Sequence, residues 1–99
     1  MKNFKPLNFV GSESYCDCTH TIGNSDVIFS INQHNGLHGA SYYEVTVKAG
    51  TLGMSLQFTT MHMAQVWANY IYCQMELDGV HASFEKNEFA VKWYKEGVA

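Results

Sequence analysis

Arginine is absent from this chain of 99 residues, and all six basic residues are lysines. Nine acidic residues outnumber them, which leaves a net charge of −3 and a pI near 5.9. Proteins that bind nucleic acids displace counterions with clustered lysine and arginine. Arginine is also the residue that grips phosphate through two parallel hydrogen bonds. The composition therefore argues against nucleic-acid binding through phosphate contacts.

Cysteine is scarce and odd in number, with only Cys16, Cys18 and Cys73. An odd count does not complete a disulfide framework, and a chain of this length can fold without one. Residues 1–14 lack the apolar segment that a signal peptide has. The most apolar stretch, 61–77, is interrupted by polar residues and is too short to span a bilayer. We therefore expect a cytoplasmic protein with free thiols and no membrane contact, folded as a single domain over residues 1–99.

The common catalytic motifs are also missing. There is no G-x-S-x-G elbow, no glycine-rich phosphate loop and no H-E-x-x-H or paired C-x-x-C pattern. Cys16, Cys18 and His20 would share one face of a strand, but alternate Cβ atoms there lie about 6.5–7 Å apart, wider than tetrahedral zinc thiolates allow. His34 and His38 could add ligands. We expect neither an enzyme nor a metal or other cofactor, and keep a small metal- or thiol-dependent enzyme as an alternative.

The first two thirds of the chain alternate between apolar and polar residues with a period of two. This pattern predicts strands at 14–22, 27–33, 41–48 and 52–58. Turn residues separate the first three, in Gly23-Asn24-Ser25-Asp26 and in Asn35-Gly36. Such alternation is typical of an antiparallel sheet with one buried face.

Residues 60–77 predict one long helix, because Thr59 or Thr60 can cap its start and Asp78-Gly79 can end it. The end of the chain has two readings. We favour a hairpin that pairs 80–85 with 88–94 through Lys86-Asn87, and keep a second helix from Ser83 as the alternative. The prediction is an α+β fold, with an antiparallel sheet of four to six strands and the long helix packed on one face.

The predicted helix is unusually apolar for a surface helix, which normally has a wide polar face. Apart from Gln74, its polar residues gather in one stripe about 60° wide on a helical wheel: Gln65, Glu76, Asn69 and His62. Either the N-terminal segment covers the rest, or a second chain covers part of it. The lid would consist of Phe4, Leu7, Phe9 and Val10. The residues that we expect in an oligomer interface are Met63, Trp67, Tyr70 and Gln74.

The face of the sheet turned away from the helix is a second candidate surface. By alternation it would show Tyr42, Glu44, Thr46, Gln57, Glu88 and Tyr94. Tyrosines beside acidic side chains suit a protein partner with a basic surface, although an ordinary solvated face would look the same. The residues that we expect to bind a partner are Tyr42, Glu44, Glu88 and Tyr94.

The order of elements from SYYEVTV onward, with a glycine-containing turn, a strand and a helix, resembles the double-stranded-RNA-binding domain. That family grips phosphates with lysines at the start of the helix. Residues 49–85 contain no lysine or arginine. The resemblance therefore covers the order of elements without the binding chemistry, and it implies no function here.

A small acidic domain without catalytic motifs is typical of a non-catalytic protein-binding module. Phage and mobile-element inhibitors of host defence complexes, including anti-CRISPR proteins, act by occupying a protein surface, and we expect a function of this class by general analogy. A homodimeric accessory or structural subunit of a larger assembly is the alternative.

Overall fold

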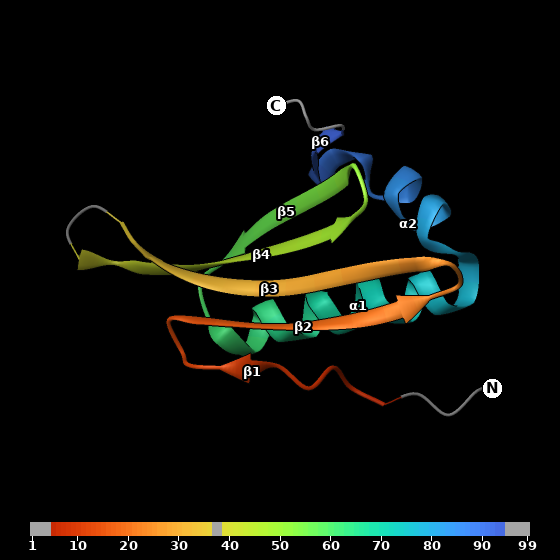
Figure 1. Cartoon of the computed structure of the whole chain (residues 1–99). Coiled ribbons are helices and arrows are strands. Elements are labelled where there is room, and N and C mark those ends of the chain that lie inside the picture. The colour runs from red at the N-terminus through yellow and green to blue at the C-terminus, as the bar shows by residue number, and fades with distance from the viewer. Residues whose placement is uncertain (1–4, 37–38, 95–99) are drawn as a thin grey trace.

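The computed structural model describes residues 5–36 and 39–94, and for 92–94 the backbone alone (Figure 1). Six antiparallel strands form a meander in which each strand pairs with its neighbour in sequence. The strands are β1 (Val10–Gly11), β2 (Tyr15–Ile22), β3 (Ser25–Asn35), β4 (Ser41–Ala49), β5 (Leu52–Phe58) and β6 (Val91–Tyr94). Between β5 and β6 lie α1 (Met61–Asp78), α2 (Val80–Lys86) and the 3-10 helix η2 (Glu88–Ala90). The predicted α+β class and its four strands β2–β5 are confirmed.

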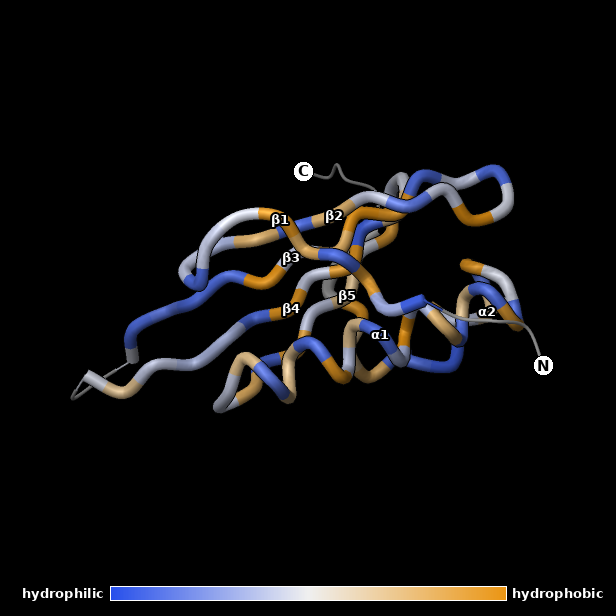
Figure 2. Tube along the Cα trace, turned by 90° about the horizontal axis from the view of Figure 1, so that it is seen from below, coloured by the Kyte–Doolittle hydropathy of each residue, from blue (hydrophilic) through white to orange (hydrophobic). Residues whose placement is uncertain are grey.

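The alternation along the strands decides which face of the sheet is buried. Phe29 and Ile31 of β3 are fully buried and pair with Val47 and Val45 of β4, which are also fully buried. The residues between them on each strand are partly or fully exposed. The apolar face packs against α1, and Figure 2 shows the sheet and α1 as two layers.

The ends of α1 follow from local hydrogen bonds. Thr60 Oγ1 accepts a hydrogen bond from the N–H of Met63 at 3.1 Å, so Thr60 is the N-cap. The helix ends at Asp78, and its C-cap is Gly79, whose φ of +101° is readily adopted only by glycine. The N–H of Gly79 donates to the carbonyl of Met75 at 2.8 Å. The predicted helix over 60–77 is therefore confirmed, although it is not the only one.

The prediction of a hairpin at the end of the chain is wrong. Residues 80–86 form α2, Glu88 lies in η2, and only β6 is a strand, paired with β5. The predicted alternation fails because Phe89 is 68% exposed whereas Ala90 is fully buried. Buried polar contacts fix the helical path instead: the Ser83 and Asn87 side chains both donate to α1. The alternative, a second helix, is confirmed, although this helix starts at Val80, three positions before Ser83.

The described part of the N-terminal segment, from Lys5 onward, covers one side of α1. Leu7 is buried, and its N–H donates to Asn69 Oδ1 at 2.6 Å. Phe9 packs against the core, but Val10 is exposed in β1. Phe4, the remaining member of the predicted lid, lies outside the described residues. Of the described part of this segment, residues 5–11, Leu7 covers the polar side of α1 near Asn69, and the large apolar side chains on the outward face of the helix remain exposed.

Candidate functional site

One face of α1 is completely buried against the sheet. It consists of Ala64, Ala68, Ile71 and Met75, at intervals of four, three and four residues. The small side chains of the two alanines allow the helix axis to approach the strands closely. This face fixes the rotation of the helix, and so determines which residues point outward.

The opposite face of α1 carries large apolar side chains that meet solvent. These are Met63, Val66, Tyr70 and Leu77, with exposed fractions of 49%, 54%, 54% and 68%. The partly exposed Cys73 lies between the last two. Steps of three, four, three and four residues from Met63 to Leu77 are the heptad spacing with which one helix packs against another. We call Met63, Val66, Tyr70, Cys73 and Leu77 the α1 stripe.

The predicted oligomer interface overlaps with this stripe in two residues, Met63 and Tyr70. Trp67 instead packs against Phe58 of β5, with 5.8 Å between ring centroids. Gln74 is bound within the chain, because its Oε1 accepts hydrogen bonds from Ser83 of α2 and from Asn87, the C-cap of α2. Val66 and Leu77 were missed by sequence reasoning, although a heptad count from Met63 would have found both.

On the other face of the sheet, the Glu44 carboxylate is the centre of a polar cluster. Its Oε1 lies 2.9 Å from Nε2 of His34, and its Oε2 accepts a hydrogen bond from Ser55 Oγ at 2.7 Å. The His34 ring stacks on Tyr42, with centroids 5.0 Å apart. Tyr42 and Glu44 therefore lie on one surface, but both carboxylate oxygens of Glu44 already have partners within the chain.

Glu88 and Tyr94, the other two predicted partner-binding residues, lie elsewhere. Glu88 is in η2, and Tyr94 is the backbone partner of Leu52 on β5. Glu44 of β4 is the backbone partner of Gln57 on β5, whereas Tyr94 lies beside Leu52 of the same strand. The five steps from position 52 to position 57 span about 17 Å of extended strand. The structure does not bring these four residues together.

Cys16 and Cys18 have the surroundings of core side chains. Cys16 is buried, Cys18 is partly buried, and both are free thiols. Burial raises the pKa of Cys18 to about 11, and the negative charge of Asp17 and the neighbouring Cys16 add to this. Burial also raises the pKa of Cys16. Both thiols are therefore protonated at neutral pH, and the protonated form is neither the nucleophile nor the metal ligand.

We expect Cys18 to react slowly with alkylating reagents. At pH 8, a thiol with a pKa of about 11 is ionised in about one molecule in a thousand. Iodoacetamide labelling followed by peptide mass spectrometry should show much slower modification of Cys18 in the folded protein than in urea. Below the pKa, the rate should rise about tenfold per pH unit, because only the thiolate reacts. Equal rates in the folded and unfolded protein would contradict the protection.

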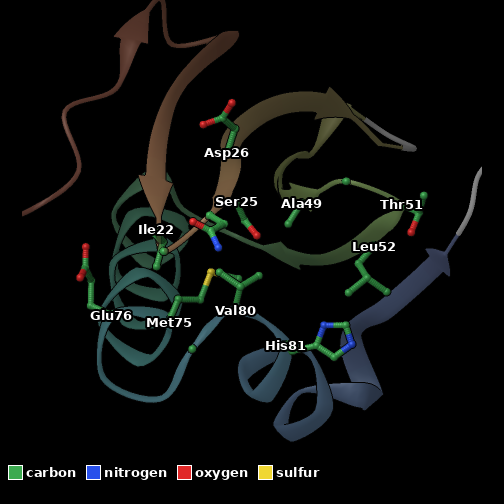
Figure 3. Close-up of a pocket in the computed structure, with 14 residues that line it drawn as sticks. Ile22, Ser25, Asp26, Ala49, Thr51, Leu52, Met75, Glu76, Val80 and His81 are labelled. Carbon is green, nitrogen blue, oxygen red and sulfur yellow. The ribbon is translucent and has the colours of Figure 1, made fainter.

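A hollow of about 850 Å³ opens where the β2–β3 turn, the β4–β5 turn and the α1–α2 junction meet (Figure 3). The buried Ile22, Ala49 and Met75 contribute to its floor. Figure 3 shows Asp26 and Glu76 at its margin, with their carboxylates turned away. The size suits a small molecule, but neither carboxylate is placed to orient one.

No protein-family model matches the chain, and neither does any curated protein or solved structure. Within residues 5–36 and 39–94, no helix combines the length and apolar character that crossing a membrane requires. In the same part of the chain, no three His, Cys, Asp or Glu side chains are placed to hold a metal ion. His38 lies outside it.

Proposed function

We propose that this chain is a non-catalytic protein-binding module and that the α1 stripe is its binding surface. The observation that supports this is a row of four exposed, large apolar side chains at helix-pairing spacing. Scattered exposed apolar residues are normal, whereas a contiguous row of them indicates an interaction site. α1 also contains no lysine or arginine, in keeping with the depletion of charge at the centre of interfaces.

The role that we propose is inhibition by occupation of a surface. A phage or mobile-element protein of the anti-CRISPR type would act in this way on a cytoplasmic host defence complex, without needing a nucleophile or a cofactor. The raised thiol pKa of Cys18 supports a non-catalytic role, because that thiol is not ionised at neutral pH. A homodimeric accessory subunit is the second candidate, and the same row of side chains supports it.

Substitution of two stripe residues tests the binding surface. Val66→Ser combined with Tyr70→Ser removes exposed apolar area, so the melting temperature should change little while capture of the partner is lost. The protein and its variants are used as bait in lysate of the native cell, and bound proteins are quantified by mass spectrometry. We expect at least a tenfold loss of the specifically captured protein.

A variant of the polar sheet face is the matched control. Tyr42→Ala combined with Glu44→Gln changes that face and keeps a side-chain oxygen for Ser55. Capture should be retained. If the control loses capture while the stripe variant keeps it, the binding surface is the sheet face and the proposal is wrong. Capture that neither variant alters would refute it as well.

A further inference from the structure

We propose that a second copy of this chain covers the α1 stripe, with the two α1 helices packed antiparallel about a two-fold axis at Tyr70. The inference rests on the proposed function, because it assigns an occupant to the same surface. A two-fold interface requires one patch to be complementary to itself. The apolar side chains of the stripe must therefore face apolar side chains of an identical stripe that runs in the opposite direction.

The stripe has this self-complementarity. Met63 and Leu77 lie seven residues before and after Tyr70, so an antiparallel pair places each Met63 opposite Leu77 of the partner subunit. Val66 lies four residues before Tyr70 and Cys73 lies three residues after it, so Val66 and Cys73 of the partner subunit are offset by one residue, about 1.5 Å along the helix axis. The two Tyr70 side chains meet at the axis. Each apolar side chain of the stripe therefore finds an apolar counterpart.

The charges on α1 favour the antiparallel direction. Both acidic residues of the helix, Glu76 and Asp78, lie at its C-terminal end, where Asp78 already pairs with Lys86 of α2 at 2.7 Å. An antiparallel pair places the C-terminal ends of the two helices at opposite ends of the interface. The two Glu76 residues are then about 18 Å apart along the axis, beyond the screening length of about 8–10 Å. A parallel pair would place like charges side by side and align the two helix dipoles unfavourably.

The position of α1 leaves room for a second helix. In Figure 2, α1 is the outer layer on its side of the sheet, and no labelled element lies beyond it. The helix is about 27 Å long, so a single pair of helices buries less surface than a standard protein interface. We therefore expect a weak dimer that forms at micromolar concentration and above.

Sedimentation velocity of the purified protein, from low micromolar to submillimolar concentration, tests the dimer. The unmodified chain should shift from monomer to dimer. Tyr70→Lys places two like charges at the axis and should weaken association at least tenfold, whereas Ile28→Lys, at an exposed position on the other sheet face, should not. A chain that stays monomeric throughout, or a dimer unaffected by Tyr70→Lys, would overturn the inference.

Disulfide trapping tests the direction of the helices. In a Cys73→Ser background, Tyr70→Cys should form an intermolecular disulfide on oxidation, because the two positions meet at the axis. Leu77→Cys should not, because the two positions are about 21 Å apart in an antiparallel pair. Cross-linking through position 77, with or without cross-linking through position 70, would contradict the antiparallel arrangement.

The outcomes separate this inference from the proposed function. A monomer that captures a foreign protein through the stripe leaves the function standing and rejects the dimer. A stripe-dependent dimer supports the inference even if no foreign protein is captured. If the stripe variants alter neither association nor capture, both proposals fail.

Discussion

Phe29→Ala is expected to lower the free energy of unfolding by about 3–5 kcal/mol, as removal of a large buried aromatic side chain usually does. Phe29 is fully buried near the centre of the sheet, opposite Cys18 on β2 and Val47 on β4. Its ring also meets the edge of Tyr72 on α1, with 5.8 Å between centroids. The substitution thus removes one of the aromatic contacts between the sheet and α1. Urea unfolding followed by circular dichroism measures the loss.

The neighbouring residue is the control for this prediction. Ile28 is on the same strand, but its side chain lies on the other face and is 38% exposed. Ile28→Ala should therefore cost less than about 1 kcal/mol, because an exposed side chain leaves no cavity behind. Equal losses from the two substitutions would mean that the buried face of the sheet is not the one described here.

The strands and α1 were predictable because short-range rules agree with the fold. Alternation along β3 and β4 places apolar residues on one face, and the tertiary structure buries that face. The cap at Thr60 and the stop at Gly79 depend on residues within one helical turn. Where local preference and packing favour the same structure, a pattern in the sequence is sufficient.

The end of the chain was not predictable from such patterns. The alternation from Phe89 to Trp93 favours a strand, yet the deciding contacts join positions 74, 83 and 87 across a change of direction. Hydrogen bonds between buried polar side chains leave no periodic trace in the sequence. The same limitation explains why Glu88 was expected on the sheet face with Glu44, since that expectation required a strand beginning at residue 88, where the structure has η2.

The candidate site was predictable in part. The excess of apolar residues on α1 indicated that its outward face could need a partner, but the wheel alone did not fix the rotation of the helix. The two alanines on the buried face determine that rotation, and they place Val66 and Leu77 outward while Trp67 contacts Phe58. Which apolar face is buried depends on close packing against the sheet, which the composition of the helix does not specify.

Gln74→Leu is expected to lower the free energy of unfolding by about 2–5 kcal/mol, because the buried Ser83 hydroxyl would lose its acceptor and the buried Asn87 amide would keep only the Ser83 carbonyl. Gln74 Oε1 accepts hydrogen bonds from Ser83 Oγ at 2.6 Å and from Asn87 Nδ2 at 2.7 Å. Ser83 is fully buried and Asn87 nearly so. Without this acceptor, α2 should detach before the sheet unfolds. Hydrogen exchange measured by mass spectrometry should show faster exchange over 80–90 than over β3.

Two further substitutions separate the lost acceptor from other effects of changing position 74. Gln74→Glu keeps an oxygen in reach of Ser83 and Asn87, so most of the stability should return. Gln57→Leu makes the same chemical change at an exposed position on β5 and should alter stability by less than about 0.5 kcal/mol. If Gln74→Leu is as stable as the unmodified chain, these hydrogen bonds do not hold α2 in place. The helical path of residues 80–86 must then depend on the packing of Phe84, which is also buried.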